Sequence, residues 1–281
     1  MLNQIKTVLL LGLLTGILLG IGYLIGGTGG LTIALIFAFI MNFISYWFSD
    51  KIVLFMYGAK EAKRSEYPKL HKIVEGVSKL ANIPKPKVYI VPMNVPNAFA
   101  TGRNKKHAVI ACTTGILSLL NDEELKGVIA HEISHIKNRD ILISSIAAVI
   151  AGAIAYIAMI ARYSLFFGDN RDRGAAGLIV LVLLSIFVPI AAMIIQLAIS
   201  RSREYLADES GARTIKNPIV LANALIKLDN SVRLHPLKNI NPSITHILIV
   251  NPFSTKEVFI SLFSTHPSVE SRVKRLGDIK F

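Results

Sequence analysis

Cysteine, charge and internal repetition are all scarce in this chain. Cys112 is the only cysteine, so no intrachain disulfide can form. It lies in an apolar run, where a small buried residue is expected, with zinc ligation as the alternative. Only 17% of the residues are charged whereas 52% are hydrophobic, which excludes an ordinary soluble domain. No internal repeat or low-complexity tract is visible, which excludes a repeat architecture.

Four apolar runs explain the hydrophobicity. Each is long enough, at 1.5 Å per residue, to cross a hydrocarbon core of about 30 Å as a helix. The first run is too long for the hydrophobic region of a signal peptide, lacks a small-residue cleavage site, and is followed by a second run after a short glycine-rich turn. We therefore predict two transmembrane hairpins. Their spans are about residues 6–26, 31–48, 141–161 and 178–200.

Basic residues set the expected orientation. Fifteen Lys and Arg lie between the second and third spans and twelve after the fourth, against three between the third and fourth. By the positive-inside rule, both termini and residues 49–140 belong in the cytoplasm. The net charge of +13 has nucleic-acid binding as an alternative, but Lys51, Lys60 and Lys63 cluster just beyond the second span. The lipid bilayer, and not nucleic acid, is therefore the expected partner.

The segment His131-Glu132-Ile133-Ser134-His135 places two imidazoles four residues apart with a carboxylate between them. On a helix both rings point the same way and can bind one tetrahedral Zn²⁺, while Glu132 stands beside the metal to activate water. Asn121 and Glu124 form an expected capping box at the start of that helix. The alternative is a pair of surface histidines beside a solvated glutamate.

Short strands are expected before this helix, at Lys87–Pro92, Asn97–Gly102 and His107–Thr113. Helices are expected in residues 50–81, with a break near Pro68. The metal-binding helix shows no stop signal, so it is predicted to continue through residues 138–140 into the third span. The metal would then lie on the order of 10 Å from the hydrocarbon edge.

A third metal ligand is expected from the segment that follows the fourth span. Glu204 and Asp208 are four residues apart, so one helix face presents both carboxylates. Glu204 can complete a His₂Glu zinc site, and Asp208 can accept the second N–H of a liganding imidazole. The alternative is a solvated, charge-rich helix start. Asp140 and Glu209 are the next candidates should Glu204 not bind the metal.

With these motifs and two flanking hairpins, nearly the whole chain resembles the HtpX family of membrane zinc metallopeptidases, which are gluzincins related to the CAAX prenyl endopeptidases. The resemblance implies one Zn²⁺ per chain, bound by His131, His135 and Glu204, with Glu132 as the catalytic base. It also implies cleavage of misfolded or damaged membrane proteins at the cytoplasmic face of the cell membrane, as protein quality control. Further implied site residues are Asp208 and Asp140 behind the ligands, His266 as a catalytic oxyanion donor, and Asn97, Ala98, Phe99 and Arg272 for substrate binding.

The expected fold is therefore α+β and mainly helical: four transmembrane helices in two hairpins, with a cytoplasmic zincin-like catalytic domain that carries a small β-sheet. Residues 1–49 and 141–200 form the hairpins, and residues 50–140 and 201–281 form the two parts of the catalytic domain. An intramembrane protease is disfavoured because residues 121–126 are too polar for hydrocarbon. A non-catalytic zinc protein is disfavoured because a structural site does not need Glu132. Natural substrates, regulators and oligomeric state stay open.

Overall fold

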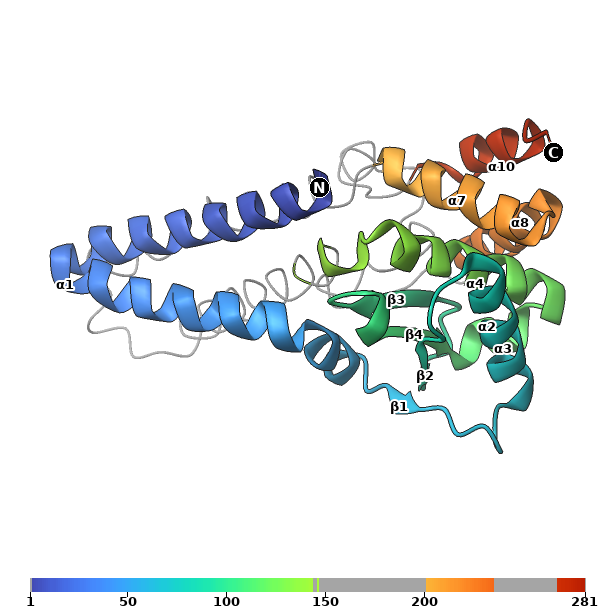
Figure 1. The fold of residues 1–281 in the computed structure, drawn as a ribbon, viewed down its shortest axis with the longest axis horizontal. Helices are drawn as coiled ribbons and strands as arrows, with labels where there is room; N and C mark the ends of the chain where they lie inside the picture. Colours follow the sequence, from blue (N-terminus) through green and yellow to red (C-terminus); the bar gives the residue numbers. More distant parts are fainter. Residues whose placement is uncertain (1, 144–145, 147–200, 235–266, 281) are drawn as a thin grey trace.

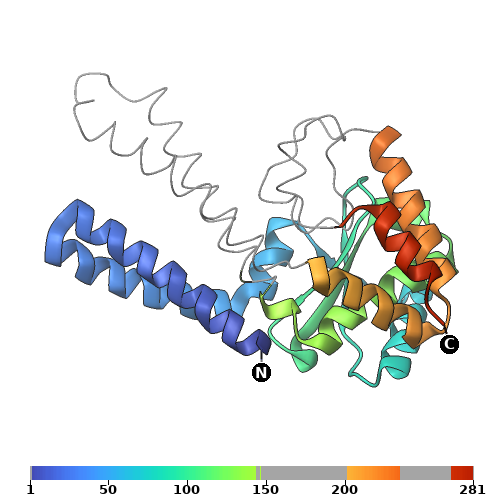
Figure 2. The same ribbon diagram turned by 90° about the horizontal axis from the view of Figure 1, so that it is seen from above.

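A long helical hairpin and a mixed unit of helices and strands make up the part of the chain that is described, namely residues 2–143, 146, 201–234 and 267–280 of a computed structural model. Figure 1 shows the hairpin projecting to one side of the α/β unit, and Figure 2 shows the same separation from above. The fold is mainly helical with a small sheet, which confirms the coarse prediction.

The hairpin consists of helix α1 (Leu2–Met56), which folds back on itself at Gly26 and Gly27. Gly27 has φ of 55°, a left-handed conformation that glycine adopts without steric cost. The two arms meet through a hydrogen bond from Asn42 Nδ2 to Thr15 Oγ1 of 2.8 Å. In the described residues, Gly26–Ile44 is the stretch long and apolar enough to cross a membrane. The expected span 178–200 lies outside the described residues, as does the expected span 141–161 apart from residues 141–143 and 146, so the second hairpin stays a prediction.

Four strands form one mixed sheet in the order β1-β2-β4-β3. Strand β2 runs parallel to β4, whereas β1 and β3 run antiparallel to their neighbours, so β3 is the sheet edge beyond β4. The three predicted strands are present, each shortened by one residue, and the two-residue β1 was not predicted. The bounds are β1 (Lys60–Glu61), β2 (Lys87–Val91), β3 (Ala98–Gly102) and β4 (Ala108–Thr113).

Helix α4 is the central helix of the α/β unit. It packs against two helices that follow residue 200 and against α2 and β3 (Figure 1). Its start carries the predicted capping box between Asn121 and Glu124. The helices are α2 (Pro68–Ala81), α3 (Thr114–Leu119), α4 (Asp122–Asn138), α7 (Arg201–Ile215), α8 (Pro218–Leu234) and α10 (Val269–Gly277), with a 3₁₀ turn at Lys105–His107.

Helix α4 ends earlier than the sequence predicts. Arg139 adopts the left-handed conformation, with φ of 62°. Its backbone N–H bonds to the carbonyl oxygen of Ile136, and the backbone N–H of Asp140 bonds to that of His135, so the two together cap the helix. The expected uninterrupted helix into residue 141 is therefore wrong. The physical reason is local. The left-handed backbone of Arg139 turns the chain, so that Asp140 lies beside His135 instead of one helix turn further along.

Small residues let α7 approach α4 closely. A Cβ placed on Gly211 would lie 2.9 Å from the backbone nitrogen of His131 and 3.0 Å from the carbonyl of Ala130. Any side chain at Gly211 would therefore push the two helices apart. This contact matters for function, because α4 and α7 carry the residues that meet in the next section.

Candidate metal centre

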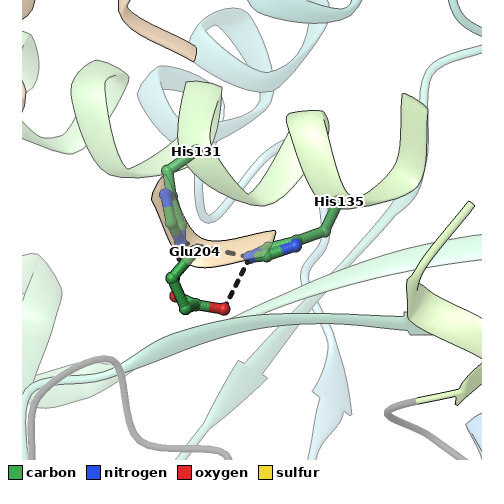
Figure 3. Close-up of side chains that lie close together, drawn as sticks. All are labelled: His131, His135 and Glu204. Carbon is green, nitrogen blue, oxygen red and sulfur yellow. Dashed lines mark hydrogen bonds and ion pairs between the residues drawn. The ribbon is translucent and has the colours of Figure 1, made fainter. Parts of the chain in front are cut away.

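Three side chains from two helices converge at one point in the interior. His131 and His135 project from α4, and Glu204 projects from α7 across the helix interface (Figure 3). The two Nε2 atoms are 3.2 Å apart. Each lies 3.5 Å from an oxygen of Glu204. The structure thus brings the three expected ligands together, although Glu204 is about seventy residues from the histidines in the chain.

These distances fit a tetrahedral metal ion. Ligand atoms bound to zinc at about 2.1 Å and at the tetrahedral angle are separated from one another by roughly 3.4 Å. The two Nε2 atoms are separated by 3.2 Å, and each lies 3.5 Å from a different oxygen of Glu204, so all three separations are near that value. Two imidazoles and one carboxylate leave a fourth position open, which is the arrangement of catalytic rather than structural zinc sites. Cys112 is buried in the main core and is not one of the three residues whose ligand atoms converge, so the alternative of cysteine ligation is not supported.

Each histidine is held from behind by an aspartate. His131 Nδ1 lies 2.9 Å from Asp208 Oδ1, and His135 Nδ1 lies 3.0 Å from Asp140 Oδ2. When each Nδ1 donates its proton to a carboxylate, the lone pair of Nε2 is directed toward the metal position. Both rings are therefore oriented and set in the tautomer that a metal requires. Asp140 reaches its ring only because α4 ends at Arg139.

Arg272 lies behind Asp208. Its side chain is fully buried, and its guanidinium binds both oxygens of Asp208, at 2.7 and 2.8 Å. We expected Arg272 to bind substrate; the structure places its guanidinium against Asp208, and substrate binding by Arg272 stays a prediction. A peptide could reach the guanidinium only by breaking a buried bidentate ion pair, so Arg272 positions Asp208 against His131.

The cluster favours positive charge at the metal position. Burial lowers the pKa of His131, but hydrogen bonds to Asp208 and Glu204 outweigh it and raise that pKa to about 10. Burial likewise opposes ionisation of Asp208, yet Arg272 and His131 lower its pKa to about 2. The pKa of His135 is also raised, since the nearby charge of Glu204 and the bond to Asp140 exceed the effect of burial. The same carboxylates that stabilise protonated imidazoles stabilise a divalent cation.

Glu132 occupies the same charge cluster but is not one of the three converging residues. It is 5% exposed, and burial raises the pKa of its carboxyl group above the usual value. The backbone N–H of Ala100 in β3 donates a hydrogen bond to this carboxylate. A carboxyl group with a raised pKa, held beside a metal position, is suited to accept and return a proton near neutral pH.

The expected substrate-binding strand lies at the sheet edge beside α4. Asn97, just before β3, is 1% exposed, and its backbone groups bond to Thr113. Ala98 packs into the main core, and Phe99 packs against Tyr57 at the end of α1. These side chains face the interior, so a role in substrate binding would come from the strand's backbone. His266, the expected oxyanion donor, lies outside the described residues.

Arg203 is a buried group that the sequence did not single out. It is 8% exposed, and its three guanidinium nitrogens have no hydrogen-bond partner in the part of the chain described here. Burial lowers its pKa, while the charges of Asp140 and Glu204 act in the opposite direction. The sequence feature that could have pointed to Arg203 is its position directly before the expected metal ligand Glu204. A buried arginine here adds positive charge that partly offsets the carboxylates of Asp140 and Glu204.

Comparisons with known proteins identify the family of this chain. The model of a family described as Peptidase family M48 matches residues 64–280. A Protease HtpX homolog from Pyrococcus furiosus is 57% identical over 236 residues, which cover 84% of this chain and 81% of that protein. A protein of the same name from Persephonella marina is 55% identical over 282 residues, covering 99% and 98% of the two chains.

A solved structure shares the fold. The crystal structure of S. mikatae Ste24p matches with a TM-score of 0.55 at 19% identity, and the match covers 99% of this chain and 66% of that one. The resemblance drawn from the sequence motifs is thus confirmed independently. Because the family match spans α4 and α7, whose side chains form the metal centre, and the relatives are more than half identical, this chain belongs to peptidase family M48.

Proposed function

We propose that this protein is a membrane-bound zinc endopeptidase that hydrolyses peptide bonds of misfolded or damaged membrane proteins at the cytoplasmic membrane surface. The observation that carries the proposal is the convergence of His131, His135 and Glu204 at tetrahedral spacing with Glu132 beside them. Two histidines alone occur by chance on many helices. A glutamate from a distant helix, together with an aspartate behind each imidazole, does not fit the alternative of solvated surface groups.

Each residue of the site has a separate role in the proposed hydrolysis. Zinc held by the three ligands would supply Lewis acidity, which lowers the pKa of a bound water towards about 7. Glu132 accepts a proton from the attacking water and later gives it to the leaving amine, and its raised pKa suits both steps. Asp208 and Asp140 fix the orientation and tautomer of the two imidazoles during these steps.

Substrate is proposed to bind as an added strand along β3. This strand pairs with β4 on one side, and Ala100 on its other edge donates its backbone N–H to Glu132. An extended peptide added there would pass beside the catalytic carboxylate and the metal position. Main-chain hydrogen bonds would supply most of the affinity, so cleavage would be broad in sequence and selective for unfolded segments. Such selectivity suits a quality-control role.

Membrane placement is supported by the apolar α1 hairpin and by the distribution of basic residues. It can be tested by cysteine labelling after Cys112→Ser. A cysteine at Ser65, which is exposed at the start of the α/β unit, should resist an impermeant maleimide in intact cells. A cysteine at Gly168, between the predicted third and fourth spans, should react. The opposite pattern would place the proposed site on the wrong side of the membrane.

The catalytic assignment is tested with Glu132→Gln in the full-length protein purified in detergent. We expect one zinc per chain to remain, while hydrolysis of unfolded casein is lost, because the base lies outside the ligand set. Glu123→Gln on the exposed face of the same helix is the matched control and should keep both properties. Loss of zinc together with activity would instead identify Glu132 as a ligand. Full activity of Glu132→Gln would refute the proposed mechanism.

A further inference from the structure

A cavity that shares no residue with the metal centre lies where the end of the α1 hairpin meets the turn between β3 and β4. Its volume is about 460 Å³. One wall is aromatic and comes from α1, and the other is basic and comes from the turn. The lining residues are Phe43, Trp47, Phe48, Asp50, Lys51, Arg103 and His107.

The arginine of this cavity is held in place by a chain of contacts. Arg103 lies over the ring of Trp47, with 4.5 Å between its guanidinium carbon and the ring centroid. Its Nη2 is 3.1 Å from Nε2 of His107, and Nδ1 of His107 is 2.9 Å from Oδ1 of Asn104. Since arginine can only donate, His107 accepts at Nε2 and donates from Nδ1 to Asn104. The guanidinium is thus fixed on the aromatic face without an acidic partner in these contacts.

The aromatic wall is exposed and lies at the end of the membrane-length stretch. Trp47 follows Gly26–Ile44 by three residues and is 44% exposed, while Phe43 is 52% exposed and Phe48 is 40% exposed. Lys51 lies one turn beyond Trp47, with its ammonium 5.3 Å from the Phe48 ring centroid. Aromatic rings next to cationic groups at a span end are typical of the membrane–water interface.

We propose that this cavity binds the headgroup phosphate of an anionic phospholipid, with its acyl chains along the aromatic wall. Arg103 and Lys51 supply two positive charges against the single carboxylate of Asp50. A free phosphate would use the basic wall but leave three exposed rings uncovered, whereas a lipid satisfies both walls. This site rests on the proposed placement of α1 in the bilayer, and it would anchor the edge strand β3 at a fixed height above the membrane.

The protein contains its own probe, because Trp47 is the only tryptophan in the chain. Full-length protein is reconstituted in phosphatidylcholine vesicles that contain a small fraction of either brominated phosphatidylglycerol or brominated phosphatidylcholine. Quenching of Trp47 by the brominated acyl chains then reports which lipid lies beside it. We expect phosphatidylglycerol to quench at roughly fivefold lower mole fraction, because Arg103 and Lys51 against Asp50 leave one net positive charge, which contributes about 1 kcal/mol. Equal quenching by the two lipids would overturn the site, and absence of quenching by both would refute the membrane placement itself.

Variants separate the site from general surface charge. Arg103→Gln should reduce the preference for phosphatidylglycerol about fivefold, and Lys51→Gln should reduce it to a similar extent. Lys72→Gln is the matched control, since it removes the same charge from the exposed face of α2, away from the cavity. Retention of the preference in both cavity variants would overturn the proposal. Loss of the preference on adding millimolar inorganic phosphate at constant ionic strength would assign the cavity to free phosphate and overturn the lipid assignment.

Discussion

Asp208→Asn tests the link between the fold and the metal centre. In the wild type, the Asp208 carboxylate binds His131 at 2.9 Å and both donors of Arg272 at 2.7 and 2.8 Å, and all three side chains are buried. Asparagine keeps the size but removes the charge. The fully buried guanidinium of Arg272 then loses its counter-charge, and His131 loses a strong acceptor for its Nδ1 proton.

Two separate effects follow, each with its own magnitude. Removing one partner of a buried ion pair costs about 3–5 kcal/mol of folding free energy. For a chain of this size that corresponds to a fall in unfolding temperature on the order of 10 °C. Loss of a carboxylate behind a liganding imidazole should weaken zinc binding roughly 10–100-fold. The first effect concerns Arg272, and the second concerns His131.

A double variant separates the two effects. Replacing Arg272 by Met together with Asp208→Asn removes both charges, so most of the lost stability should return while zinc affinity stays low. Unfolding in detergent at saturating zinc measures the first quantity, and competition with a chelator measures the second. Glu209→Gln is the control, because that exposed carboxylate pairs with the equally exposed Arg213 and its loss should change both values little. Wild-type stability and zinc affinity in Asp208→Asn would refute the reasoning.

Three further predictions concern the same site. Glu204→Ala should lose both zinc and casein hydrolysis, measured by metal content and by cleavage rate; stoichiometric zinc would show that the third ligand lies elsewhere. Zinc affinity should rise with pH up to about 10, because binding must displace protons from His131 and His135, whose pKa values are raised in the metal-free fold; a chelator titration at several pH values would refute this by showing no slope. Gly211→Ala should destabilise the protein by about 1–3 kcal/mol, seen in thermal unfolding, since its methyl group would press on the backbone of His131; unchanged stability would contradict the close packing.

Much of the site could be predicted from the sequence because its signals are local. The spacing of His131 and His135 is a property of one helix turn, and the pairing of Glu204 with Asp208 is another, so each pair needs only a helix to share a face. The strands before α4 and its capping box follow from equally short patterns. Such features depend only on residues a few positions apart, so they can be recognised from the sequence alone.

The long-range partners could not be predicted in this way. The buried pair of Arg272 with Asp208 joins residues 64 positions apart, and the sequence suggested a substrate role for that arginine instead. The end of α4 at Arg139 was missed because no glycine or proline marks it, and the contact of Asp140 with His135 supports a conformation that local propensity does not favour. Tertiary contacts outweighed local preference at both positions.

The sequence by itself determined which chemistry is available: two imidazoles, a metal-binding carboxylate, a base and an apolar hairpin. The tertiary structure alone decided how these groups meet, because their final spacing depends on how closely α7 packs on α4. Gly211 permits that approach, and the 3.2–3.5 Å separations among His131, His135 and Glu204 follow from it. The physical reason is that the sequence states the type of each side chain directly. The distances between side chains, in contrast, depend on close packing between segments that are distant in the chain.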